Sequence, residues 1–366
     1  MKGLLCITIM FLFSSCYEKS DYDIIEINPL ENLNKSENIS IKEILGQLDL
    51  EYTVLETDTS CLIGRNPEFY VTSDYIISMD KNRCLLFSRK SGSMIREILH
   101  KDQDDTAYRN TLRGGNVALI EETEDILFEG LKPNELLIYS LKNDTKQTLQ
   151  LHGHTYTVAP IGPISFVSAT RNVLGNDSHT MFLYDNEQVV DSIPNTQMFD
   201  NSENALVIFN NDDYFYRYAG VTYYKNVTND TIFQVNMQGK HPHAVFHTEG
   251  KGVSLDMRKH VELFRQNDEI LQIYSIVENK DYIFYQIRQG KQFYKLIHNK
   301  SNRTSHLIAG TGLKNDIDGV ADLWPYRITK NNEYVFIMDP ASLDENTLLK
   351  LGVDSERNPI IVIGKK

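Results

Sequence analysis

The residues best suited to chemistry form one short run near the end of the chain, Asn315-Asp316-Ile317-Asp318-Gly319. Carboxylates and an amide ahead of a glycine can surround a calcium ion, because this hard cation takes several oxygen ligands around a tight turn. The run lacks the distal glutamate of a complete calcium-binding loop. In the alternative interpretation, Asp316 or Asp318 accepts hydrogen bonds from backbone amides, and the run is a turn beside Gly319.

The single tryptophan of the chain, Trp324, follows this run closely. An exposed indole ring suits stacking on a sugar, because ligand sites are lined largely by aromatic side chains. We therefore predict a ligand-binding surface formed by Asn315, Asp316, Asp318, Gly319 and Trp324. We predict no cofactor and no metal site, with calcium at this loop as the open alternative.

Three histidines, His241, His243 and His247, share parity and would point to one face of an extended strand. His243 and His247 would then lie about 13 Å apart, which is too far for one three-histidine zinc site. Two acidic runs, residues 121–125 and 210–213, are typical of solvated turns, and the first could place carboxylates at one mouth of a ring. No nucleophile or phosphate-loop motif occurs, so no catalytic residue is predicted.

The N-terminus predicts an envelope lipoprotein. Lys2, an apolar run from Leu4 to Phe13 and two serines precede Cys16. The apolar run is about half the length of a membrane-spanning helix, as in a signal peptide. We predict a signal peptide at residues 1–15, acylation of Cys16 (palmitate among its lipids) and a polar tether at residues 16–48. An ordinary cleavable signal is the alternative.

The charge and composition of the chain limit the classes of molecule that it can bind. The formal charge is −13 and no basic cluster occurs, which argues against nucleic acid, so the lipid anchor is the expected contact with the membrane. The content of 20 Tyr and 16 Phe favours strands over helices. Two cysteines remain in the mature chain, Cys61 and Cys84, and the sequence leaves open whether they pair or stay as buried thiols.

The rest of the chain consists of short apolar runs between turn residues, in sets of four that recur roughly every 40–55 residues, as propeller blades do. The first set is regular: Glu68–Ser73, Tyr75–Met79, Cys84–Ser88 and Met94–Leu99. The third set is less clear, with strands predicted at Ile164–Ala169, Arg171–Leu174, Thr180–Tyr184 and Val189–Ile193. The pattern recurs at Ala205–Asn210, Tyr214–Tyr218, Thr231–Asn236 and Ala244–His247. Short helices are predicted at Ile41–Leu48, Leu255–Phe264 and Asp344–Leu351.

These sets predict an all-β fold, a six-bladed β-propeller of four-stranded antiparallel blades over residues 49–366. The last set is one strand short, and the run Glu51–Glu56 can complete it from the N-terminus. Such a strand would close the ring and leave no open sheet edge at the seam. Two stacked β-sandwiches are the alternative architecture.

Several segments resemble a known family: Tyr52–Thr57, Asn229–Phe233, Leu313–Gly319, Trp324-Pro325 and Asn358–Gly364. With the lipoprotein signal, they are similar to the six-bladed β-propeller lipoproteins of gut-type Gram-negative bacteria. The resemblance implies this fold and an envelope location, but no defined activity. Residues 100–108 depart from the family, because an acidic stretch replaces a loop rich in Gly and Arg.

We therefore predict an outer-membrane lipoprotein, with the outer surface favoured by the acidic stretch Tyr17–Asp23. Its propeller would serve as a binding or scaffold module for a glycan, a peptide or a protein partner. The alternative is an enzyme of the lactonase or lyase type with a metal at the channel centre. That enzyme would need several carboxylate and amide oxygens to converge on one cation.

Overall fold

The computed structural model describes residues 24–65, 67–80, 83–100, 117–129, 134–153, 155–172, 174–200, 209 and 212–366. The predicted lipid-attachment residue Cys16, the stretch Tyr17–Asp23 and the acidic loop after His100 lie outside these residues. No helix in the described part of the chain is both long and apolar enough to cross a bilayer.

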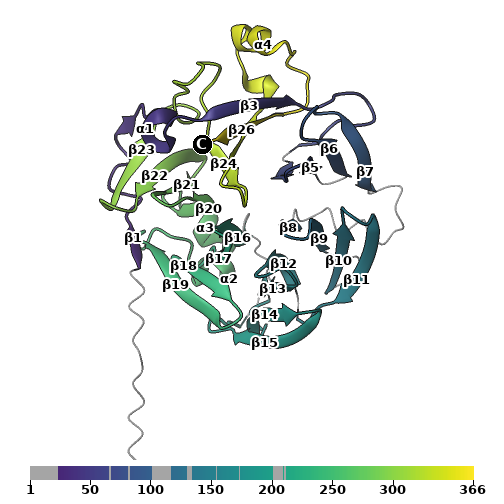
Figure 1. The fold of residues 1–366 in the computed structure, drawn as a ribbon. Helices are drawn as coiled ribbons and strands as arrows, with labels where there is room; N and C mark the ends of the chain where they lie inside the picture. Colours follow the sequence, from purple (N-terminus) through teal and green to yellow (C-terminus); the bar gives the residue numbers. More distant parts are fainter. Residues whose placement is uncertain are drawn as a thin grey trace, which may run out of the picture.

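Six antiparallel sheets surround a common centre, as predicted (Figure 1). Blades 1 to 3 each have four strands, which run outward in sequence order. Their strands are β4 (Glu68–Val71), β5 (Tyr75–Met79), β6 (Arg83–Ser88), β7 (Met94–His100), β8 (Val117–Ile120), β9 (Asp125–Glu129), β10 (Glu135–Ser140), β11 (Thr145–Gln150), β12 (Thr155–Pro160), β13 (Ser165–Thr170), β14 (His179–Asp185) and β15 (Gln188–Pro194).

Blades 4 to 6 include strands from the N-terminal segment. Their strands are β16 (Asp213–Tyr218), β17 (Val221–Asn226), β18 (Thr231–Asn236), β19 (Gly239–Phe246) and β1 (Ile25–Ile27) in blade 4; β20 (Leu271–Glu278), β21 (Tyr282–Gln289), β22 (Gln292–Asn299), β23 (Thr304–Ile308) and β2 (Ser36–Glu37) in blade 5; and β24 (Pro325–Ile328), β25 (Tyr334–Met338), β26 (Ile360–Lys365) and β3 (Asp49–Val54) in blade 6.

The ring closes as the sequence predicts. Strand β3 pairs antiparallel with β26 over six residues, from Ile360 opposite Val54 to Lys365 opposite Asp49. In Figure 1 the purple β3 lies beside the yellow β26, although they come from opposite ends of the chain. This pairing satisfies the backbone groups of β26 that would otherwise form an open edge.

The apolar core is divided into layers between neighbouring blades rather than gathered in one centre. For example, Phe128 of blade 2 packs with Leu86 of blade 1, whereas Phe284 of blade 5 packs with Phe336 of blade 6. Many strands are buried on both faces for this reason, and all six residues of β13 are buried. Strands that are covered on both faces have continuous apolar sequences, which explains why apolar and polar residues alternate only weakly in them.

Residues 24–48 differ from the expected tether. Strand β1 pairs in parallel with β19, and β2 pairs in parallel with β23, so this segment covers the outer edges of blades 4 and 5. Its apolar side chains Ile27, Ile41 and Leu45 are at most 2% exposed. Burial of these side chains, together with the cost of leaving two sheet edges unpaired, explains why the segment is docked.

Other differences concern short elements. The structure has strands β12 and β17 where none was predicted, and Arg171 and Asn172 form no strand. Nearly all of the predicted strand Ala205–Asn210 lies outside the described residues. The helices are α1 (Ile41–Leu45), α2 (Leu255–Lys259), α3 (Val261–Arg265), α4 (Glu345–Leu351) and a 3₁₀ turn, η2 (Pro340–Ser342).

The disc has two faces, which differ in the chain connections that they carry. In every blade, the turn between the first and the second strand lies at the same face, which we call the turn face. Residues 121–124 and 329–333 are two of these turns. The chain passes from blade to blade at the other, the crossover face, which carries residues 195–200, 247–270 and 309–324. This distinction locates the sites described below.

Candidate functional site

The predicted ligand loop is a turn whose polar atoms bind the rest of the chain. The Asn315 side-chain oxygen accepts from the backbone N–H of Ile317 at 3.1 Å, and Asp318 Oδ1 accepts from Val320 N–H at 3.0 Å. Asn315 Nδ2 donates to Asp318 Oδ1 at 2.7 Å. Gly319 has a φ of 68°, in the left-handed region that favours glycine. These bonds are those of the alternative interpretation, an Asx turn.

The same loop holds the N-terminal segment. Asp316 Oδ1 accepts from the backbone N–H of Lys42 at 3.1 Å, and the hydroxyl of Tyr52 donates to Asp318 Oδ2 at 2.8 Å. Burial, with the Asp318 carboxylate beside it, raises the pKa of Tyr52. The carboxylates that were expected to face a ligand therefore contact α1 and β3.

Trp324 lies between blades 5 and 6. Its ring packs edge-on against Phe284 with centroids 5.8 Å apart, and Lys295 Nζ lies 5.6 Å from the ring centroid. The side chain is half-buried and contacts the apolar layer between these blades. A role in ligand binding at Asn315–Gly319 and Trp324 stays a prediction, and the observed contacts are structural.

The histidines have acidic neighbours. His243 Nε2 lies 2.9 Å from a carboxylate oxygen of Glu278, and His247 contacts Glu26 of β1. Cys61 and Cys84 are both free and buried. Among the described residues, one group of three ligand atoms lies within 4.8 Å of one another, at Glu56, Asp58 and Cys61. Cys61 Sγ there already contacts the backbone oxygen of Glu56 at 3.2 Å.

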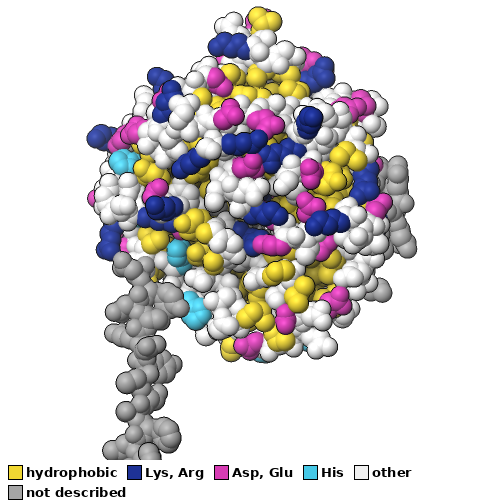
Figure 2. Space-filling model, in the orientation of Figure 1, with side chains coloured by type: hydrophobic (Ala, Val, Ile, Leu, Met, Phe, Trp, Pro, Cys, Tyr) yellow, Lys and Arg dark blue, Asp and Glu magenta, His cyan; other side chains and the backbone are white. Residues whose placement is uncertain are grey.

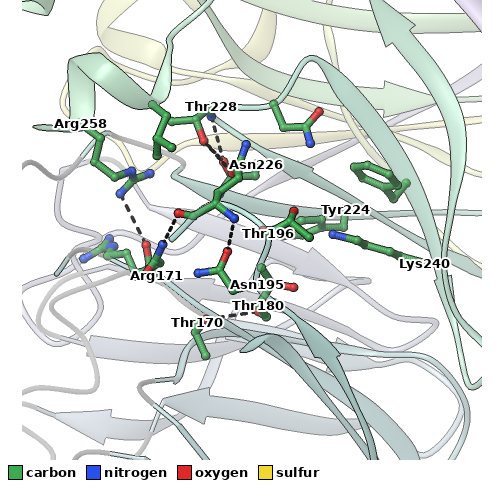
Figure 3. Close-up of a pocket in the computed structure, with 15 residues that line it drawn as sticks. Thr170, Arg171, Thr180, Asn195, Thr196, Tyr224, Asn226, Thr228, Lys240 and Arg258 are labelled. Carbon is green, nitrogen blue, oxygen red and sulfur yellow. Dashed lines mark hydrogen bonds between the residues drawn. The ribbon is translucent and has the colours of Figure 1, made fainter. Parts of the chain in front are cut away.

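A polar groove opens on the crossover face between blades 3 and 4 (Figure 3). Its walls come from the β13–β14 turn, the connection after β15, the β17–β18 turn and helix α2. The lining side chains are mostly amides and hydroxyls with three cations: Thr170, Arg171, Asn172, Thr180, Asn195, Thr196, Gln197, Tyr224, Asn226, Thr228, Asn229, Phe233, Lys240, Leu255 and Arg258. No part of this site was predicted from the sequence.

Hydrogen bonds between the walls fix the shape of the groove. Asn172 Nδ2 donates to the backbone oxygen of Gln197 at 3.0 Å, and Thr228 Oγ1 donates to Gln197 Oε1 at 3.1 Å. Asn195 Oδ1 in turn accepts from the backbone N–H of Gln197 at 2.8 Å. Residues of both blades thus converge on Gln197, and the groove is formed before any ligand arrives.

Lys240 is the cation of the groove that has no acidic partner among the described residues. Its ammonium lies 4.9 Å from the centroid of the Phe233 ring, and burial lowers the pKa of this lysine. Figure 3 shows Lys240 beside Tyr224 at one end of the groove. The positive charge is therefore held on the groove wall without a neutralising carboxylate.

Behind the groove, Arg258 of α2 binds the fully buried Asp212 through both guanidinium nitrogens, one of them at 2.9 Å. The adjacent Asp213 accepts from Tyr224 and, at 2.9 Å, from Asn226, while its second oxygen has no partner among the described residues. Burial raises the pKa of Asp213 to about 6, and the neighbouring Asp212 adds to the rise. Both aspartates were predicted to lie in a solvated turn, and their burial shows that this prediction is wrong.

Comparison with known families supports the fold. The family model described as "Domain of unknown function (DUF4934)" matches residues 24–365. The chain belongs to this family. The matched range begins with β1, so the docked N-terminal segment is part of the DUF4934 domain. The comparison with curated protein sequences found no match.

Two solved structures are similar to this DUF4934 chain. A Bacteroides fragilis protein, provisionally described as exported, aligns with a TM-score of 0.67 and 13% identity, covering 93% of this chain and 99% of that one. A Bacteroides thetaiotaomicron protein of unknown function aligns with a TM-score of 0.45 and 10% identity over 87% and 76% of the two chains. At such identities the first likeness supports the propeller fold alone.

The centre of the DUF4934 ring bears on the alternative of a metal enzyme. The inner strands β4 and β24 place the carboxylate of Glu68 there together with the guanidinium of Arg327, which attracts it electrostatically. A cation would meet a fixed positive charge at this position. The described residues at the ring centre therefore suit an anion better than a metal ion.

Proposed function

We propose that this chain is an exported binding protein that takes an acidic saccharide into the groove between blades 3 and 4. The observation that carries the proposal is the unneutralised Lys240 on a wall of amides and hydroxyls. Side-chain amides and hydroxyls both donate and accept hydrogen bonds, as sugar hydroxyls require. A carboxylate on the sugar would supply the negative charge that Lys240 lacks.

The chemistry of the wall favours this class of ligand over an apolar one. Asn172, Asn195 and Asn226 each spend part of their hydrogen-bonding capacity within the wall. Each side-chain amide has two donors and two acceptor lone pairs, so some remain for a ligand. A charge-assisted hydrogen bond from Lys240 would then be stronger than the neutral ones around it.

Calorimetric titration of the mature chain with tri-galacturonate tests the proposal, with neutral galactotriose as the matched ligand. We expect binding of the acidic sugar, and we expect Lys240→Gln to weaken it by about tenfold or more. Lys291→Gln removes an exposed lysine on blade 5 and should change nothing. Equal affinity for both sugars, or an unaffected Lys240→Gln variant, would sink the proposal.

We also propose that a lipid on Cys16 holds the propeller at the outer membrane, with its outer surface favoured. Support comes from the lipoprotein signal and from the acidic stretch Tyr17–Asp23. Because β1 begins at Ile25, only nine residues from Cys16 precede it, and they reach about 30 Å when fully extended. The edge of blade 4 would therefore stay close to the bilayer.

Metabolic labelling with a palmitate analogue tests the anchor. The wild-type chain should take up the label and sediment with membranes, whereas Cys16→Ser should do neither. Protease treatment of intact cells then separates the outer surface from the periplasm, because only a surface protein is cleaved. An unlabelled wild-type chain in the soluble fraction would contradict the anchor.

A further inference from the structure

A second charged cluster lies at the ring centre, where inner strands from opposite sides of the disc face one another. Strand β4 provides Glu68 and Tyr70, β24 provides Tyr326 and Arg327, and β16 provides Tyr214. The guanidinium carbon of Arg327 lies 3.9 Å from the centroid of the Tyr70 ring and 5.7 Å from that of Tyr326. This cluster is separate from the groove between blades 3 and 4.

The tyrosines of the cluster are fixed by the neighbouring blades. The hydroxyl of Tyr70 contacts Glu68 Oε2 at 3.1 Å and the backbone oxygen of Val117 in blade 2. The hydroxyl of Tyr214 donates to the backbone oxygen of Ile276 in blade 5 at 3.0 Å. Five of the six blades thus contribute to the cluster, and its aromatic walls are rigid.

Arg327 lies near two carboxyl groups, Glu68 and Glu121, which attract it electrostatically. Within the described part of the chain it forms no ion pair, and its guanidinium stacks on the Tyr70 ring. A guanidinium carries five N–H donors, so most of them have no protein acceptor here. Burial raises the pKa of Glu68, and the nearby Arg327 opposes this rise.

Solvent reaches the cluster. Glu68, Tyr214, Tyr326 and Arg327 each keep part of their surface exposed, although they lie at the centre of the ring. In Figure 2 basic and acidic side chains also gather around the middle of the visible face. Part of the surface of Arg327 is therefore exposed at the ring centre.

The turn face is bridged across the ring opening by non-adjacent blades. Arg217 of blade 4 pairs with Glu122 of blade 2 at 3.0 Å. The backbone N–H of Lys330 in blade 6 donates to Glu121 Oε2 at 2.7 Å, and Lys330 Nζ donates to the Glu121 backbone oxygen at 2.6 Å. These contacts span the ring opening on the turn face.

We propose that Arg327 binds the carboxylate of a small aromatic or otherwise planar organic acid at the ring centre. A planar carboxylate matches the guanidinium fork through two parallel hydrogen bonds. The rings of Tyr70, Tyr214 and Tyr326 offer the apolar walls that such a ligand needs. Glu68 disfavours a doubly charged phosphate, since its carboxylate would repel the second charge.

Titration of the full mature chain with sodium benzoate tests this site, with benzamide as the neutral isostere and inorganic phosphate as the other oxyanion. Calorimetry and the thermal midpoint are the readouts. We expect benzoate to bind and to raise the midpoint, and benzamide and phosphate to do neither. Equal effects of benzoate and benzamide, or binding of phosphate in place of benzoate, would overturn the proposal.

Variants locate the site. Arg327→Lys keeps the charge but loses the fork, so we expect benzoate affinity to fall about tenfold or more. Glu68→Gln removes the nearby carboxylate and should strengthen binding. Arg357→Gln, which changes an exposed arginine, is the control. If Arg327→Lys fails to fold, the Glu68→Gln variant tests the proposal instead. Benzoate binding by Glu68→Gln that is unchanged or weaker than in the wild type would overturn the proposal. Lys240→Gln should leave benzoate binding intact, so this site and the saccharide groove fail independently.

Discussion

Arg89 of blade 1 and Glu333 of blade 6 form a two-point ion pair across the seam where the ring closes. The two N–O distances are 2.7 and 2.8 Å, and the side chains are 8% and 13% exposed. Arg89 Nη1 also donates to the backbone oxygen of Thr72 at 2.8 Å, and its own backbone oxygen accepts from Thr53 of β3. Arg89 therefore links strand β3, blade 1 and blade 6 at the place where the ring closes.

Breaking this pair should loosen the seam. Arg89→Met leaves the Glu333 carboxylate nearly buried without its partner, and we expect unfolding free energy to fall by about 2–4 kcal/mol. Urea unfolding followed by circular dichroism measures the change. Arg357→Gln breaks an exposed pair and should cost less than about 0.5 kcal/mol. Equal effects of the two variants would show that the seam does not depend on Arg89.

The sequence predicted the seam because the evidence for it is local. One blade lacked a strand, and Glu51–Glu56 had the alternation to complete it. The groove between blades 3 and 4 could not be predicted in this way. Thr170, Asn195, Asn226 and Lys240 come from four separate turns or strands, and each is unremarkable in its own segment. They meet only because two blades pack side by side.

The docked N-terminal segment was missed for a related reason. Strand β1 has three residues and β2 has two, which is too short for a periodic pattern to indicate a strand. Arg327 and Tyr70 were missed because they are 257 positions apart and meet only where blade 6 packs beside blade 1. In each case the determining contact lies between segments distant in sequence, which local patterns do not encode.

Leu45 tests whether the N-terminal segment is part of the folded domain. This side chain is 2% exposed and packs in the layer between blades 5 and 6. Leu45→Ala should lower the free energy of unfolding by about 2–4 kcal/mol through lost burial and a residual cavity. Leu349→Ala is the matched control, because Leu349 is 80% exposed on α4. If Leu45→Ala and Leu349→Ala both had wild-type stability, the N-terminal segment would be a flexible tether, as the sequence predicted.

Asp213 predicts a pH dependence of stability. Burial raises its pKa to about 6 in the folded state, so the fold favours the protonated form. This contribution is fully present below the unfolded pKa, near 3.8, and is lost as pH rises through 6. Asp213→Asn does not titrate, so its stability relative to wild type should increase between pH 4 and 7, by about 1–3 kcal/mol.

Thermal or urea unfolding at several pH values measures that difference. Asp212→Asn serves as the comparison, because it leaves the buried Arg258 without its ionised partner and should destabilise the chain throughout this range. A difference between Asp213→Asn and wild type that stays constant with pH would show that Asp213 is ionised to the same extent in both states.

The last prediction concerns Asn315 and calcium. Asn315 is 5% exposed, and its amide holds the turn through Ile317 and Asp318. Asn315→Ala should therefore lower unfolding free energy by about 1–2 kcal/mol, since a buried backbone N–H loses its acceptor. Because Asp316 and Asp318 already accept from Lys42 and Tyr52, we expect neither calcium nor a chelator to shift the wild-type thermal midpoint. A calcium-dependent rise that Asn315→Ala abolishes would instead establish a cation site at this loop.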